Sequence, residues 1–122
     1  MAVRSIIKLL LLTVITLPAC YYDNEETLYP AGECITTDIS FSQDIVPIIQ
    51  QHCYGCHSAA VNTANITLEG HNNMVKYAQN GRLLGAIKHS SGYIAMPQGE
   101  AMLSDCNIAK IEQWITDGKP NN

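Results

Sequence analysis

Apolar residues recur with helical spacing in several short segments after residue 40. In the range 41–53 they stand three and four positions apart, which predicts a first helix. Ser42 is the expected N-cap, with Phe41 and Val46 placed to form a hydrophobic staple across the first turn. Pro47 lies one turn into this segment. Because proline is best tolerated in a first turn, the regular helix is expected to begin a few residues after Ser42.

Two further short helices are predicted over 74–80 and 82–88. They are separated by Gly81, at a position that requires a left-handed backbone. The polar stretch 58–67 and the stretch 89–99, which contains glycine and proline, are predicted to be loops. The middle of the domain should therefore consist of short helices joined by long connections.

The clearest pattern lies near the C-terminal end of the chain. Ser104 is the expected N-cap of a last helix, with Leu103 and Ile108 placed to form its staple. Its apolar face consists of isoleucines with a tryptophan beside them: Ile108, Ile111, Ile115 and Trp114. Gly118 and Pro120 are expected to end it. The sequence contains no long alternation typical of strands and no internal repeat, which predicts an all-α fold of about four to five short helices.

The first 20 residues have the pattern of an export signal. Arg4 and Lys8 precede an apolar run that is short for a permanent span, which takes about 20 apolar residues. The sequence LPAC (17–20) resembles the lipobox of bacterial lipoproteins, which predicts cleavage after residue 19 and lipidation of Cys20. The alternative is an ordinary signal peptide with an incidental thiol. The expected location is a bacterial membrane surface, facing the periplasm or the cell exterior.

Charge and length bound what the mature chain can do. Removal of residues 1–19 takes away two basic residues and no acidic one, which leaves 103 residues with a net charge of −6. This length is sufficient for one compact domain. An acidic chain lacks the basic face that a nucleic-acid partner requires. Residues 20–40 are assigned to an acidic tether and residues 41–122 to the domain.

The cysteines of an exported chain are expected to have partners, because thiols oxidise outside the cytoplasm. Cys20 is assigned to lipid, while Cys53 and Cys56 belong to the motif described next. Elimination leaves Cys34 and Cys106 as a possible disulfide. The alternative is a pair of buried free thiols.

The segment CYGCH (53–57) carries the chemistry of the chain. Two thiols three positions apart project from one face of a helical turn, so each can add to one of two neighbouring vinyl groups on a haem edge. The histidine that follows at once can then ligate the iron on the proximal side. The pattern predicts one covalently attached haem c, held by Cys53, Cys56 and His57.

Three other interpretations of the cysteine pair explain less of the segment. A zinc site needs two further ligands with close spacing, and the sequence has neither a second Cys-x-x-Cys nor a His pair. A thioredoxin-like redox pair follows a β-strand, and none is predicted here. A plain disulfide, or two incidental thiols, leaves His57 without a role.

The sixth iron ligand has several candidates, namely Met74, Met96, Met102, His71 and His89. Met96 has the most suitable context, because Pro97 and the flanking glycines hold it in an extended loop. Its alternative role is that of a core methionine. His89 is the runner-up as ligand and would give a bis-histidine haem of lower potential.

With these residues in place, the range 41–121 resembles the class I c-type cytochrome domain of bacterial membrane-anchored and periplasmic proteins. The resemblance rests on the haem motif and on four other segments, DIVPI (44–48), GRLL (81–84), AMP (95–97) and LSDC (103–106) leading to Trp114-Ile115 and Gly118. It implies that Met96 is the distal ligand. It also implies that the first and last helices cross, with Trp114 packed in the haem pocket or at this crossing.

One departure from that family concerns the proximal histidine. The loop after His57 lacks an obvious proline to hold the second ring nitrogen. Which carbonyl accepts that hydrogen bond is left open.

These features favour an electron carrier over an enzyme, namely a membrane-tethered monohaem cytochrome that cycles between Fe(III) and Fe(II). The acidic surface predicts a redox partner with a basic docking patch and an association that weakens with salt. Because the haem would form part of the core, the apo-protein should be poorly folded. Two alternatives stay open. One is a haem-based ligand-binding, sensor or peroxidase-like protein with an open or labile distal site, and the other is a docking subunit of a larger complex.

Overall fold

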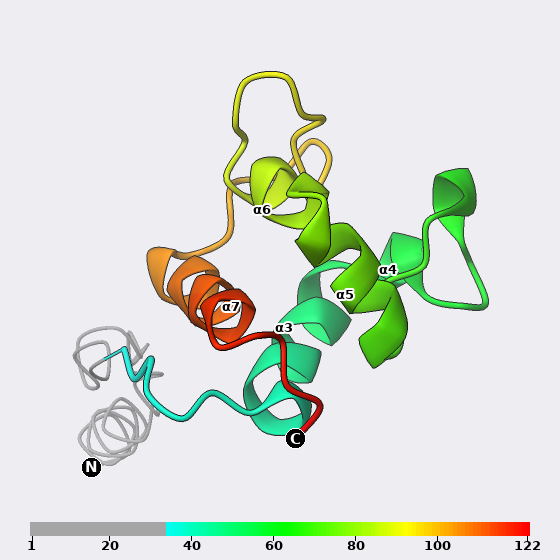
Figure 1. Cartoon of the computed structure of the whole chain (residues 1–122). Helices are drawn as coiled ribbons and strands as arrows, with labels where there is room; N and C mark the ends of the chain where they lie inside the picture. The colour runs from blue at the N-terminus through cyan, green and yellow to red at the C-terminus, as the bar shows by residue number, and fades with distance from the viewer. Residues whose placement is uncertain (1–33) are drawn as a thin grey trace, which may run out of the picture. The chain divides into compact units, whose positions relative to one another are not determined.

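The structure, a computed structural model, describes residues 34–122, and in this range the chain consists of helices and loops without a strand. The predicted all-α class is therefore confirmed for that part of the chain. In chain order the elements are the π-helical turn η2 (Phe41–Ile45), α3 (Val46–His52), α4 (Tyr54–His57), the 3₁₀ turn η3 (Thr63–Asn65), α5 (His71–Gln79), α6 (Arg82–Ile87) and α7 (Asp105–Thr116) (Figure 1). None of these helices has the length and apolarity that a membrane crossing requires. The predicted signal (1–19), lipidated Cys20 and most of the tether lie outside the described residues.

The assignment of Ser42 as the N-cap of the first helix is wrong, whereas the regular helix α3 begins at Val46, a few residues after Ser42 as predicted. Ser40 caps η2, with its hydroxyl accepting a hydrogen bond from the amide of Gln43. In return, the Asp44 carboxylate accepts one from the Ser40 amide at 3.0 Å. The π-helical turn separates this cap from α3, so Pro47 falls in the first turn of α3, where its missing N–H breaks no helical hydrogen bond.

The later helices follow the predicted pattern closely. Helix α5 begins at His71, three residues before the predicted start. Gly81 has φ +73°, the predicted left-handed conformation between α5 and α6. Ser104 caps α7 as predicted, with its hydroxyl accepting from the amide of Asn107 at 3.2 Å. The buried positions of α7 are Ile108, Ile111 and Trp114, while Ile115 is only partly buried.

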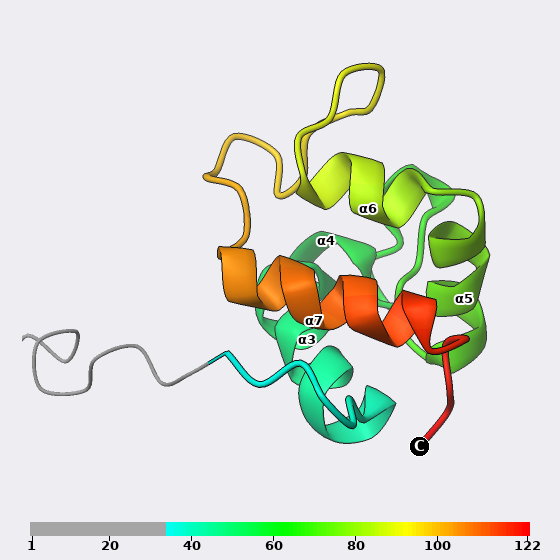
Figure 2. The same cartoon turned by 60° about the vertical axis from the view of Figure 1, so that its left-hand side comes forward.

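Helix α7 organises the core, because it packs against both η2 and α6 (Figure 2). Trp114 is fully buried and lies 5.4 Å from the Phe41 ring, in a stacked arrangement. The Trp114 ring nitrogen donates to the Pro120 carbonyl at 2.9 Å, so the polar atom of this buried ring is satisfied. The first and last helical elements thus meet through aromatic packing.

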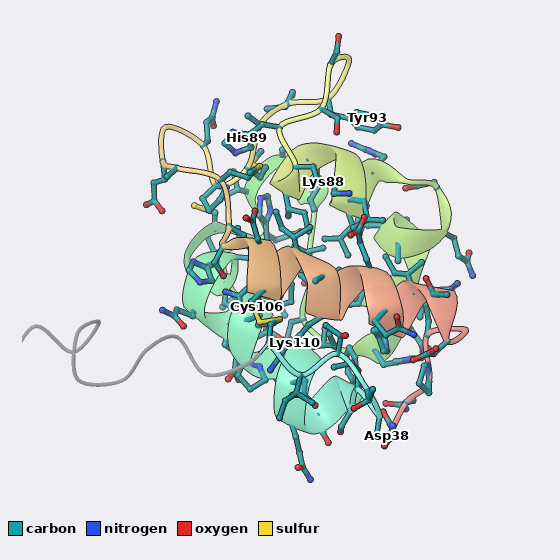
Figure 3. All side chains as sticks on the ribbon, turned by 90° about the vertical axis from the view of Figure 1, so that its left-hand side faces the viewer. Asp38, Lys88, His89, Tyr93, Cys106 and Lys110 are labelled. Carbon is teal, nitrogen blue, oxygen red and sulfur yellow. A yellow bond between two sulfur atoms is a disulfide. The ribbon has the colours of Figure 1, made fainter. Side chains whose placement is uncertain are left out.

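Residues 34–40, which the sequence assigns to the tether, pack as part of the compact unit Cys34–Asn122. Ile39 is buried in the core. Cys34 is joined to Cys106 in α7 by a disulfide, with the two Cα atoms 5.6 Å apart (Figure 3). At the other end, Asn122 accepts hydrogen bonds from the amides of Phe41 and Ser42 at 2.7 and 2.9 Å. Both ends of the unit are therefore fastened to other elements.

Candidate functional site

The two motif cysteines lie in one turn at the junction of α3 and α4. Cys53 separates the two helices, and its carbonyl accepts from the amides of Cys56 and His57 at 3.1 and 2.8 Å. Both thiols are free. The Cys53 thiol is partly buried against the core, while Cys56 is exposed. The turn therefore presents two unpaired sulfur atoms next to one imidazole.

Burial raises the pKa of the Cys53 thiol to about 11, from an ordinary value of 9.0. Cysteines that serve as redox nucleophiles have lowered pKa values, because a nearby positive charge or helix N-terminus stabilises the thiolate. At neutral pH Cys53 is therefore a protonated thiol in partly apolar surroundings. This state disfavours the thioredoxin-like interpretation.

The His57 ring is held by a loop that returns to it. Its Nδ1 atom lies 3.1 Å from the Ile66 carbonyl oxygen. The Leu68 amide donates to the His57 carbonyl at 2.8 Å, which fixes the loop to the same residue a second time. A carbonyl oxygen can only accept, so Nδ1 donates, and in the neutral ring the lone pair is on Nε2. The carbonyl that the sequence left open is that of Ile66.

The loop that brings Ile66 back to His57 has an unusual backbone. Three non-glycine residues in it adopt left-handed φ angles between +48° and +57°: Asn62, Ala64 and Asn65. For alanine this conformation costs on the order of 1 kcal/mol. The loop is closed by a hydrogen bond from the Ala59 amide to the Glu69 carboxylate at 2.8 Å. Strain of this kind persists only where surrounding contacts fix it, and here those contacts include the hydrogen bonds to His57.

Met96, the predicted distal ligand, is half-buried in the loop after α6. Its amide donates to the Ala86 carbonyl at 3.0 Å, and its own carbonyl lies 3.2 Å from His89 Nε2. The His89 ring is exposed, beside the loop that carries Tyr93 (Figure 3). The structure thus brings the two distal candidates into direct contact with each other.

The remaining distal candidates have other surroundings. Met74 is buried in the core, and Met102 is 44% exposed. His71 packs edge-on against Phe41, and its Nε2 atom lies 2.8 Å from the Lys119 carbonyl oxygen. The structure places Trp114 beside these aromatic rings, at the crossing of η2 and α7. A role for Trp114 in a haem pocket stays a prediction.

The residues present fit a covalent haem better than an ion held by protein ligands. Within residues 34–122, no three His, Cys, Asp or Glu side chains gather in a position to share a metal ion. The motif instead offers one nitrogen donor and two free thiols. A solvent-open polar groove lies elsewhere, between residues 36–39 and the end of α7, and none of the motif residues lines it.

Comparisons of the chain with protein-family models, with curated proteins and with solved structures found no match. The resemblance to class I c-type cytochromes therefore rests on the residues of this chain alone.

Proposed function

We propose that this chain is a monohaem c-type cytochrome that carries single electrons between partner proteins. The observation that carries the proposal is the state of the CYGCH turn. Two free thiols share one turn with a histidine whose Nδ1 atom donates to the Ile66 carbonyl. The lone pair of Nε2 is therefore free to bind a metal. Hydrogen bonding of the second ring nitrogen is the usual support for a metal-bound histidine, because it orients the ring and raises its basicity.

Each residue has a distinct part in this assignment. Cys53 and Cys56 would form the two thioether bonds, His57 would be the proximal ligand and Met96 the distal one. When bound, the haem supplies one-electron chemistry by cycling between Fe(III) and Fe(II). The protein fixes the proximal ring through Ile66 and holds the distal loop against α6.

The small helical fold supports the same proposal. Helices α3 to α7 and the turn η2 surround a single core in which the last helix packs on the first. A domain of this size buries little apolar surface through its side chains alone, so a buried haem macrocycle would add apolar contacts to the core. We therefore assign the fold to the small cytochrome c type, and expect the holoprotein to be more stable than the apo-protein.

The cellular setting is part of the proposal. A lipid on Cys20 would hold the domain at a bacterial membrane, exposed to the periplasm or the cell exterior. The mature charge of −6 favours a redox partner with a basic docking patch. The compartment is also one in which the Cys34–Cys106 disulfide persists.

A haem protein with an open distal site is the second candidate, and it differs only on the distal side. The imidazole that contacts Met96 is that of His89, and its Nε2 atom is already engaged by the Met96 carbonyl. While this contact is kept, Nε2 cannot act as an acid or base on a bound ligand, which removes one of the two ring nitrogens from that role. The contact therefore favours the carrier.

The decisive experiment is expression in a host that matures c-type cytochromes. Haem absorbance should stay with the wild-type polypeptide after acid-acetone extraction and should be lost from the Cys53→Ala/Cys56→Ala variant. The ferric spectrum should be low-spin, with a weak far-red methionine band and slow uptake of cyanide. A colourless wild-type protein with both motif thiols still titratable would contradict the proposal, whereas a high-spin haem that takes cyanide rapidly would favour the open distal site.

A further inference from the structure

The end of helix α6 has a specific hydrogen-bonding pattern. The His89 amide donates to the Ala86 carbonyl at 3.2 Å, and the Ser90 amide donates to the Gly85 carbonyl at 2.9 Å. His89 itself has φ +50°, so it occupies the left-handed position of a Schellman motif. This motif closes the last turn of the helix.

Glycine fills the corresponding position at two other helix ends in this domain. Gly81 follows α5 with φ +73°, and Gly118 follows α7 with φ +90°. A side chain with a Cβ is disfavoured in this conformation, which glycine adopts without penalty. A histidine at the end of α6 therefore weakens the cap, and its side chain is the feature that glycine cannot provide.

That side chain contacts the backbone of Met96. His89 Nε2 lies 3.2 Å from the Met96 carbonyl oxygen, and because a carbonyl only accepts, the ring nitrogen donates. The Met96 amide donates to the Ala86 carbonyl at 3.0 Å. Both backbone polar groups of Met96 are thus bound to the last turn of α6 and the residue that ends it.

A second contact seats the same loop on α6. The ring of Tyr93 lies directly over Gly85, so that a methyl group added there would be 2.5 Å from the ring carbons. Tyr93 is therefore held against α6 by an aromatic contact, and Met96 is held to α6 and to His89 by two hydrogen bonds. The loop is thus attached at two points, Tyr93 and Met96.

We infer that His89 is a positioning residue for Met96, holding the methionine backbone in place rather than ligating the metal. This inference rests on the proposed function, because it assigns Met96 to the distal side. In the neutral ring the hydrogen bond to Met96 requires the proton on Nε2, so this nitrogen is not available to a metal while the contact is kept, and the ring is committed to the backbone of its own loop. His89 thus combines a strained left-handed backbone with a side chain that makes a specific contact, and this combination is expected at a functional site.

The test compares His89→Gly with His89→Gln in the holoprotein. Glycine removes the ring but suits the left-handed backbone, so the thermal midpoint should stay equal or rise. The far-red methionine band should weaken, and the affinity for cyanide should increase about fivefold, which is the factor that one hydrogen bond of ordinary net strength is worth. Glutamine, with an amide on a chain of similar length, should restore the band and the wild-type affinity.

Two further variants sharpen the test. Gly85→Ala displaces Tyr93 without touching His89 and should also raise cyanide affinity. Asp38→Gly relieves another left-handed residue, φ +54°, in the segment before η2, and should leave the band and the affinity unchanged.

Three results would overturn the inference. Wild-type band and cyanide affinity in His89→Gly would show that the ring does not position Met96. A low-spin haem that survives Met96→Ala but is lost in both His89 variants would make His89 the ligand. A wild-type protein without attached haem would overturn the proposed function as well. This result is seen in the wild type alone, so it is distinguished from a failure of the inference about His89, which appears only in the variants.

Discussion

The proximal and distal sides of the candidate site are built in different ways. On the proximal side, the hydrogen bonds that hold His57 and its loop all join residues within the range 53–69, through both the ring and the backbone of His57. On the distal side, Met96 depends on residues 86 and 89, across a connection that includes exposed Tyr93 and Ile94. The proximal half is thus a local unit, whereas the distal half depends on how one loop seats on one helix. We expect the two halves to respond differently to mutation.

The strongest contrast should come from the two proposed ligand residues. His57→Ala removes the nitrogen donor beside the thiols, and its yield of holoprotein should fall at least about tenfold, because ligation and attachment occur on the same turn. Met96→Ala should retain covalent haem but become high-spin. Haem content per polypeptide and the ferric visible spectrum measure both outcomes. Met102→Ala, at an exposed methionine, is the control and should match the wild type in both. Equal loss of haem in the two ligand variants would remove the contrast between the halves.

Two buried leucines provide a matched pair. Leu68 adjoins the loop that supplies the Ile66 carbonyl, while Leu103 lies between the distal loop and α7. Each leucine-to-alanine change should lower the free energy of unfolding by about 2 to 5 kcal/mol, as buried truncations do. Denaturant unfolding followed by circular dichroism measures this loss.

The same pair should separate by its effect on the haem. Leu68→Ala should raise the reduction potential, because a looser hydrogen bond from Nδ1 makes His57 a poorer donor and so favours Fe(II). Leu103→Ala should chiefly increase cyanide affinity. Identical shifts in both properties would show that the two sides are mechanically coupled.

A smaller effect, confined to the fold, is expected at Trp114. Trp114→Phe keeps an aromatic ring against Phe41 but loses the hydrogen bond from the Trp114 ring nitrogen to the Pro120 carbonyl, which is left unpaired. The cost should be about 1 to 3 kcal/mol in unfolding free energy. Thermal and urea unfolding should record this loss, while the visible spectrum stays that of the wild type. A spectral change would place Trp114 in the haem pocket instead of at the helix crossing alone.

The smallest effect should come from Asp44, which lies in η2 and contacts Ser40 and Lys110, residues of neither half. The Ser40 amide, and then Lys110, lower the pKa of its carboxyl below the ordinary 3.8. A lowered pKa means that the stabilisation is present above this value and is lost as the pH falls through the folded-state pKa. Asp44→Ala should therefore cost about 1 kcal/mol near neutral pH, as the loss of a helix cap does.

The difference in free energy of unfolding between Asp44→Ala and the wild type should become smaller when the pH is lowered below about 4. Urea unfolding at neutral and acidic pH measures it. Glu112→Ala is the control, because it removes only the exposed ion pair with Lys88, which should be worth less than about 1 kcal/mol at either pH. If Asp44→Ala loses the same unfolding free energy at acidic and at neutral pH, the charge of the Asp44 carboxylate does not stabilise the fold.

Much of the fold could be predicted because the signals are local. Ser104 is followed by an apolar stripe at helical spacing, and Gly81 stands where a left-handed residue is required. The first helix was harder, since Ser40 and Ser42 both flank Phe41 and either suits a cap. The π-helical turn that decides between them has no sequence pattern of its own. The start of α5 was missed because its first residues are polar and give no periodicity.

The candidate site also has a part that the sequence predicts and a part that it does not. The motif indicates Cys53, Cys56 and His57 by residue type alone, because in the proposed function their side chains would perform the chemistry. The Ile66 carbonyl and the Ala86 carbonyl are backbone atoms that any residue could supply, so no sequence pattern indicates them. The contact between His89 and Met96 was equally hidden, since it needs the left-handed turn that aims the ring at the loop.

The disulfide also determines how the domain would bear a mechanical load. Tension that arrives along the chain from its N-terminal side reaches Cys34 and passes through the sulfur atoms into the first turn of α7. The segment 35–45, with its capped turn, is bypassed. To pull the domain apart, such a force would have to shear α7 across η2 and α6 together, whereas without the cross-link it would peel the chain away from Ile35 inward, one contact at a time.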